Sequence, residues 1–294
     1  MIDAVMSLAF IAMVIRIAVP YAFAALGGAV SERCGVVDLA LEAKLAFGAF
    51  AAASVAHATG SGMAGIAAAI AAGALVSVAQ VGCALWLKAD QIIVGIALNI
   101  IALAGTRFLM QVIYHEGANT PPGPAYGDAV LNNPLVIGAF VTAIAVPLAV
   151  RYTRWGLRLR AAGDRPGALV AAGLSPRRAR MGAALIGGAL AGAGGAQLSL
   201  SVGGFSADMT SGRGYFAVAM VIVANWRPGW AAVSCLGVAI AHAIGIELQL
   251  FHPVIAGIPV PSELSPLLPY ILTVVALAIW NGKSRQPPAA LGKI

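Results

Sequence analysis

Long apolar segments, separated by short polar, glycine-rich or proline-rich stretches, occupy most of this 294-residue chain. Hydrophobic residues make up 60% of the sequence and charged residues 10%, whereas soluble domains carry about 25% charged residues. Because roughly 20 apolar residues cross a bilayer as a helix, we predict an all-α polytopic membrane protein with about nine transmembrane segments, within a range of about eight to ten. The expected segments are residues 4–27, 36–56, 63–87, 92–113, 134–150, 181–201, 214–225, 230–250 and 265–280.

The positive charges indicate which side of the membrane is cytoplasmic. Eight of the 18 Lys and Arg residues lie in the loop 151–180, beside a single acid, Asp164. The positive-inside rule places this loop in the cytoplasm, and counting crossings from it places the C-terminus inside and the loop 114–133 outside. Three further basic residues fall on inside turns by this count, namely Arg33, Lys88 and Arg227. The net charge of +7 is therefore assigned to topology and to contact with the lipid bilayer, and no nucleic-acid partner is expected.

The expected organisation is one transmembrane domain over residues 1–282 and a short, disordered cytoplasmic tail over residues 283–294. Ala22-Phe23-Ala24 would fit a signal-peptide cleavage site. However, no basic residue precedes the apolar stretch, and Arg16 and Pro20 interrupt it, so a retained first span is favoured.

No motif indicates an enzyme or a cofactor. Lys283 and Ser284 resemble the end of a phosphate-binding loop, but Leu277 stands where that loop needs a glycine. The three cysteines are far apart and are predicted to be small buried residues rather than a disulfide or metal framework. We therefore expect no catalytic residues, no metal and no bound cofactor.

Two charged elements lie where apolar spans begin. In residues 31–44, Asp38 and Glu42 are four apart, which predicts that both lie on one helix face. They would repel each other unless a cation or ligand lies between them or they face water, and a solvated helix start is the alternative. The glycine-rich residues 203–214, which include Asp208, require protein or water to satisfy their backbone at membrane depth. Since the two elements run in opposite directions in the predicted topology, they indicate an inverted repeat, whose interface usually carries the solute site.

Two polar residues are predicted inside spans, where each is costly and requires a partner. Arg16 is expected to pair with Asp38, Glu42 or Asp208, unless it reaches the membrane surface. Asn99 is expected to bond either a neighbouring helix or a solute.

Several blocks of the sequence resemble permease subunits of ATP-binding-cassette importers for simple sugars and nucleosides, which are relatives of the branched-chain amino acid and ribose permeases. The first block reads Ser-Glu-Arg-Cys-Gly-Val-Val-Asp-Leu-Ala-Leu-Glu, at residues 31–42. The others are residues 91–99, 153–164, 171–174, 187–196, 209–215 and 225–228. The sequence departs from the family pattern at Asp38, usually Asn, and at Ala43-Lys44, where the family usually has Gly, so the solute stays open.

The resemblance implies an inverted-repeat importer permease in the inner membrane of a bacterium, with its C-terminus in the cytoplasm. It implies a cytoplasmic ATP-binding subunit, a second and longer permease subunit, and an extracytoplasmic substrate-binding lipoprotein as partners. The chain would form half of a pathway for nucleosides or simple sugars. The residues expected near that pathway are Asp38, Glu42, Asn99, Phe205 and Asp208.

In the family, a short cytoplasmic helix inserts into a cleft on the ATPase. We expect such a helix over residues 163–176, with Asp164 as its N-cap and Pro166 in its first turn. The residues expected to couple this chain to the ATPase are Asp164, Arg165, Pro166, Leu169, Ala172, Leu174, Arg177 and Arg178. The alternative is a solvated loop that only sets topology.

Two rival functions belong to other classes. An ion-coupled secondary transporter would use Asp38, Glu42 or Asp208 as proton carriers and would work without an ATPase. A membrane scaffold or receptor would leave the glycine-rich segment unexplained.

Overall fold

The computed structural model describes residues 8–127, 132–251, 254–255, 258–259, 267–279 and 286–293, and most of these are helical. Among them, six helices are long and apolar enough to cross a membrane. These are α2 (Leu8–Arg33), α4 (Gly62–Trp86), α5 (Gln91–Tyr114), α6 (Pro134–Tyr152), α9 (Pro176–Val202) and α11 (Pro228–Phe251). Shorter helices are α3 (Leu41–Thr59), α7 (Arg154–Asp164), α8 (Pro166–Ala171), α10 (Arg213–Val223) and α12 (Leu268–Ile279). The prediction of an all-helical polytopic membrane protein is confirmed.

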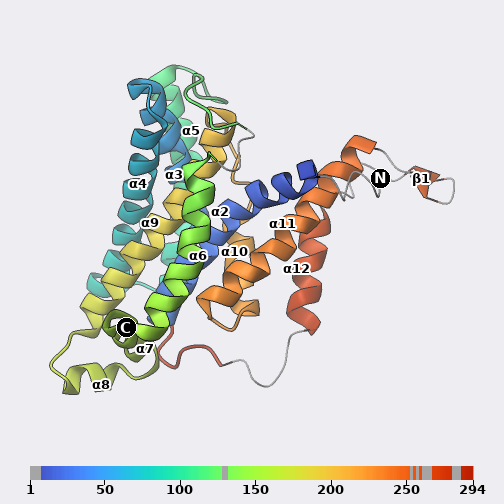
Figure 1. The fold of residues 1–294 in the computed structure, drawn as a ribbon. Coiled ribbons are helices and arrows are strands. Elements are labelled where there is room, and N and C mark those ends of the chain that lie inside the picture. Colours follow the sequence, from blue (N-terminus) through green and yellow to red (C-terminus); the bar gives the residue numbers. More distant parts are fainter. Residues whose placement is uncertain are drawn as a thin grey trace.

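Helix α9 lies at the centre of the bundle, packed against α2, α3 and α4 (Figure 1). The backbones approach so closely that a Cβ atom on Gly192 would lie 2.1 Å from the carbonyl oxygen of Ala69. Between membrane helices, where no hydrophobic force drives association, such small residues allow the close van der Waals packing that stabilises the bundle.

Most predicted spans lie within a few residues of the observed helices, but the second expected segment is wrong in its first part. Residues 34–40 are not helical, and α3 begins only at Leu41. Asp38 therefore does not share a helix face with Glu42, because the chain is extended or turning where the helix was expected. A second non-helical segment, residues 203–212, separates α9 from the short helix α10, as the glycine-rich sequence predicted.

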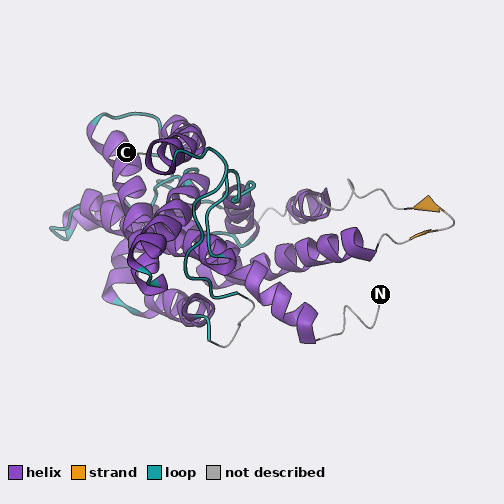
Figure 2. Ribbon diagram, turned by 90° about the horizontal axis from the view of Figure 1, so that it is seen from above, coloured by secondary structure: helices purple, strands orange, loops and turns teal. Residues whose placement is uncertain are grey.

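The two ends of the bundle differ in character. Helices α7 and α8 lie at one end, together with residues 286–293 (Figure 1). At the other end, the segment after α5 crosses over residues 200–207. A two-stranded antiparallel hairpin, β1 (Val254–Ile255) with β2 (Ile258–Pro259), was not predicted and lies apart from the helices in two views (Figures 1 and 2).

The predicted disorder of the tail is wrong for residues 286–293, which are packed through two backbone hydrogen bonds to other elements. The tail residues Lys283 and Arg285, and Asp128 in the loop after α5, lie outside the described residues. All three cysteines are free thiols, and the prediction that they are buried is confirmed for two of them and wrong for Cys83. Cys34 and Cys235 are buried, whereas Cys83 is partly exposed.

Candidate solute pathway and coupling segment

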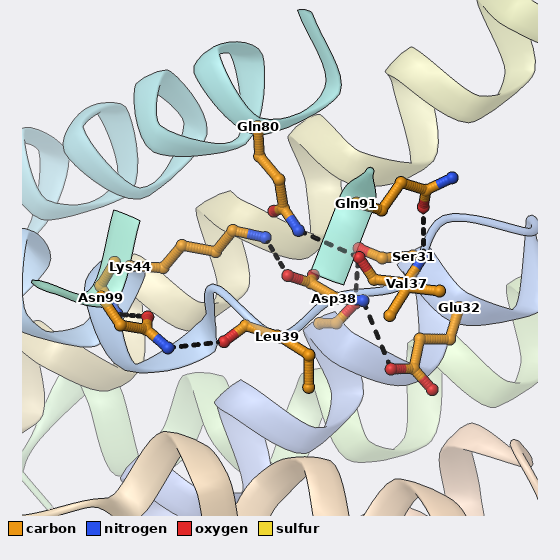
Figure 3. A network of polar contacts seen from close by, with 11 residues as sticks. Ser31, Glu32, Val37, Asp38, Leu39, Lys44, Gln80, Gln91 and Asn99 are labelled. Carbon is orange, nitrogen blue, oxygen red and sulfur yellow. Dashed lines mark hydrogen bonds and ion pairs between the residues drawn. The ribbon is translucent and has the colours of Figure 1, made fainter. Parts of the chain in front are cut away.

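The non-helical residues before α3 are held by amide side chains from neighbouring helices (Figure 3). The backbone N–H of Val37 donates to Oε1 of Gln91 at 2.7 Å, and the Val37 carbonyl accepts from Nε2 of Gln80 at 3.0 Å. Asn99 donates through Nδ2 to the Leu39 carbonyl at 2.8 Å and accepts through Oδ1 from the N–H of Ala43 at 3.0 Å. Because an apolar environment supplies no partners, these side chains replace the bonds that a continuous helix makes within itself.

Asp38 forms an ion pair with Lys44 inside this network. Nζ of Lys44 lies 2.5 Å from Oδ1 of Asp38, and both side chains are fully buried (Figure 3). Glu32 lies beside the pair, accepting from the N–H of Asp38 at 3.4 Å and from Nε1 of Trp226 at 2.6 Å. The charge of Asp38 is therefore compensated by a residue six positions away.

Glu42 joins the beginnings of the two shorter helices α3 and α10. Its carboxylate accepts from the N–H groups of Gly212 at 2.9 Å and Gly214 at 2.6 Å. The first turn of a helix has unpaired N–H groups and a positive end, which suit a carboxylate. Gly214 is required by the close approach, since a Cβ atom there would lie 2.3 Å from the backbone nitrogen of Glu42.

The three carboxylates that were expected to pair with Arg16 therefore bond to other groups. Asp38 pairs with Lys44, Glu42 binds backbone N–H groups, and Asp208 forms an ion pair with Arg107. The pairs form between side chains that the folded backbone brings together, which the spacing of charges along the sequence did not indicate.

A cavity of about 200 Å³ lies between α3, α5, α10 and residues 205–212. Four of the five residues predicted near a pathway line it, namely Glu42, Asn99, Phe205 and Asp208. Asp38 does not line the cavity and instead belongs to the buried polar network with Lys44. The structure thus brings together residues from both charged elements of the sequence.

Some polar groups that line this cavity are already hydrogen-bonded within the protein, whereas others are exposed. Glu42 and Asn99 are occupied in joining α3 to α10 and α5, as their hydrogen bonds show. Asp208, which lines the cavity, and its ion-pair partner Arg107, which does not, are each half exposed. The ring of Phe205, which packs edge-on against Phe50 with centroids 5.7 Å apart, also lines the cavity. Phe205 is only 3% exposed, so the more accessible ring of the lining is that of Tyr215, which is 51% exposed, and Asp208 carries the exposed charge.

Sequence reasoning missed Tyr215, whose hydroxyl accepts from Nδ2 of Asn99 at 3.1 Å and which lines the cavity with Thr106. The sequence does contain a pattern that indicates Thr106. The buried face of α5 repeats at helical spacing through Gln91, Asn99 and Thr106, a polar stripe in an otherwise apolar helix.

The extended loop after α5 covers the wall of this cavity. The N–H groups of Thr120 and Gly123 donate to the carbonyls of Phe205 and Gly203 at 2.8 Å and 2.7 Å, and Ala207 donates to Ala118 at 2.8 Å. The loop therefore pairs with the non-helical segment by backbone hydrogen bonds, much as two strands pair.

The basic loop contains two helices where one was expected. Asp164 is not an N-cap, because it is the last residue of α7. Arg165 is the N-cap residue of α8, without a side-chain capping bond, and Pro166 is at its start as predicted. Ala172 ends α8, and the N–H of Leu174 bonds back to the carbonyl of Leu169 at 2.8 Å.

The side chains of this loop divide by burial. Leu169 is buried against Val30, Leu159 and Ala183, whereas Val170 is 63% exposed. The exposed residues of the predicted coupling set are Asp164, Arg165, Ala172, Arg177 and Arg178. The last two lie in the first turn of α9, which begins five residues before the span predicted from hydropathy because Ser175 caps it.

Comparison with known proteins identifies the relationship. A family model described as branched-chain amino acid transport system / permease component matches residues 10–277. The nucleoside ABC transporter permease protein NupC of Lactococcus lactis is 33% identical over 92% of this chain and 91% of its own length. The guanosine ABC transporter permease protein NupQ of Bacillus subtilis is 31% identical over 92% of each chain. TsgC13 of Haloferax volcanii, whose name proposes a glucose ABC transporter permease, is 29% identical over 87% of this chain and 86% of its own.

No solved structure matches the chain. The family model spans most of the chain, and the first two relatives each cover more than nine-tenths of it. The chain thus belongs to the family of branched-chain amino acid transport system permease components, and it is a multi-pass membrane permease of an ABC transporter and not itself an enzyme.

Proposed function

We propose that this chain forms half of the translocation pathway of an ATP-driven importer, and that the cavity beside Glu42 is its part of the solute path. The proposal rests on the meeting of Glu42, Asn99, Phe205 and Asp208 in one cavity. At about 200 Å³ this cavity is smaller than ordinary ligand sites of roughly 300–1,000 Å³, as expected if a second permease subunit supplies the other half.

Two features support an inverted repeat of α2–α5 and α9–α12. Each half has a long helix, a non-helical segment and then a shorter helix, and Glu42 joins the beginnings of the two shorter helices. This arrangement is the one in which transporter sites lie between repeats. In this proposal, the end bearing α7 and α8 and the C-terminus face the cytoplasm of a bacterium.

Nucleosides are the proposed solutes, with simple sugars as the alternative. The relatives NupC and NupQ are named for nucleosides and guanosine. A nucleobase can stack on the half-exposed ring of Tyr215, which lines the cavity, and ribose hydroxyls can bond the ion pair of Asp208 and Arg107.

The proposed partners are a cytoplasmic ATP-binding subunit, a second and longer permease subunit, and an extracytoplasmic substrate-binding lipoprotein. The exposed residues of the coupling set, among them Arg165, Arg177 and Arg178, would contact the ATP-binding subunit, together with the exposed side chain of Val170 on α8. In this scheme Leu169 acts indirectly, because it anchors α8 to the membrane helices.

The test is uptake of labelled nucleoside or glucose by the complete complex in proteoliposomes. Tyr215→Ala should lower nucleoside uptake roughly fivefold or more, since stacking on an aromatic ring contributes about 1–3 kcal/mol per base. The matched control is Phe108→Ala, which removes a ring that is 66% exposed on α5. Uptake by the lone chain with an ion gradient and no ATP-binding subunit would establish the secondary transporter instead.

A further inference from the structure

The chain returns to the base of the bundle after its last helix. Residues 286–293 form a turn in which the N–H of Ala290 donates to the carbonyl of Gly163 at 2.8 Å. Two residues later, the N–H of Gly292 donates to the carbonyl of Gly35 at 3.2 Å. Ala290 is 6% exposed, so this contact is packed as well as hydrogen-bonded. The tail therefore bridges two elements that are separate in sequence.

The junction contains glycines because no side chain fits there. Gly35 has φ +95°, and a Cβ atom on it would lie 3.1 Å from the Ala290 carbonyl oxygen and 3.4 Å from the guanidinium of Arg180. A Cβ atom on Gly163 would lie 2.2 Å from the carbonyl oxygen of Arg33. The end of α7, the end of α2 and the tail thus meet with their backbones in direct contact.

The bridged elements lead to the two functional regions. Gly163 is followed within three residues by α8, the segment proposed to contact the ATP-binding subunit. Gly35 is the second of the non-helical residues 34–40, which carry Asp38 and lead to Glu42 at the cavity. Lys293 also borders a groove of about 640 Å³ that Val170, Arg177 and Arg180 line. The tail is therefore placed between the coupling segment and the solute path.

We propose that residues 286–293 are a positioning strap that ties the end of α7 to Gly35, so that movement of α8 is transmitted to residues 34–40. This inference rests on the proposed function, because it assigns a route between the ATPase contact and the cavity. A backbone hydrogen bond contributes about 0.5–1.5 kcal/mol. Losing the Ala290 bond therefore shifts the balance between bound and released strap by roughly fivefold.

The experiment compares four altered chains with the unaltered chain in the complete transporter, with each rate divided by the amount of assembled complex. Ala290→Pro removes the N–H that bonds Gly163, whereas Ala290→Ser keeps it. Ala289→Pro is the matched control, because Ala289 is exposed and a proline there leaves the N–H of residue 290 intact. The fourth chain ends after Arg285 and lacks the strap.

The measured quantity is solute molecules imported per ATP hydrolysed. We expect this ratio to fall by up to about fivefold in Ala290→Pro and further in the truncated chain. Basal hydrolysis and assembly with the ATP-binding subunit should stay unchanged. Ala290→Ser and Ala289→Pro should behave as the unaltered chain does. A purely structural role would lower the amount of complex and leave the ratio of import to hydrolysis unaltered.

Two results would overturn the proposal. One is an unchanged ratio in the truncated chain, and the other is a truncated chain that fails to assemble with the ATP-binding subunit. The unaltered chain distinguishes a failure of the strap proposal from a failure of the proposed function. If it imports solute with ATP and the truncated chain does so equally well, only the strap is rejected.

Discussion

The buried pair of Asp38 and Lys44 gives the most direct test of how this fold tolerates charge in the membrane. Both side chains are fully buried and their charged atoms are 2.5 Å apart. Removing one partner of such a pair leaves an uncompensated charge and typically costs about 3–5 kcal/mol. Lys44→Met should therefore shift the unfolding equilibrium more than roughly 100-fold toward the unfolded state.

The double replacement Asp38→Leu/Lys44→Met provides the decisive comparison. Replacing a buried ion pair by apolar residues of similar volume is often neutral, because the desolvation cost of both charges disappears with their attraction. We therefore expect the double variant to be more stable than either single variant. The non-additivity should be on the order of 3 kcal/mol or more.

The assay is reversible unfolding of the purified chain in detergent, followed by the fluorescence of its tryptophans. Trp226 reports on this region, since its Nε1 donates to Glu32 beside the pair. A Lys44→Met variant as stable as the unaltered chain would refute the reasoning. So would single and double variants whose losses simply add.

Three further predictions concern other contacts. Glu42→Gln removes the carboxylate that accepts two N–H groups at the start of α10, so we expect a loss of about 1–2 kcal/mol in unfolding and slower import; unchanged values would exclude a capping role. Gly192→Ala should lower the free energy of unfolding by about 1–3 kcal/mol, because its Cβ would lie 2.1 Å from a backbone oxygen. The control Gly182→Ala has open space around its Cβ, so its free energy of unfolding should change by no more than about 0.5 kcal/mol in the same assay. Maleimide should label the partly exposed Cys83 before the buried Cys34 in the folded chain, and the reverse order by mass spectrometry would contradict this packing.

Apolar length and composition predicted most helices to within a few residues, since a membrane helix satisfies its backbone internally. The exception is informative. Residues 36–40 were expected to begin a span, yet they are not helical, and Gln80, Gln91 and Asn99 from other helices accept or donate in place of helical partners. No local pattern in residues 34–40 reveals those partners.

The candidate site shows the same division. Its residues were recognisable one by one as costly polar groups in apolar surroundings, and four of them do line one cavity. The sequence did not show what each residue does in the fold, since Glu42 and Asn99 form hydrogen bonds that join helices. It also gave no sign of the contacts that Tyr215 and Arg107 make with residues of the site.

By itself, the sequence determined that the chain is a helical membrane protein with one strongly basic loop, because hydrophobicity and charge act locally along the chain. Only the tertiary structure decided which charges pair. Lys44 compensates Asp38, Glu42 caps a helix that begins 171 residues later, and the tail reaches Gly35. The reason is physical, since a buried polar group bonds whichever partner the packed helices bring within about 3 Å.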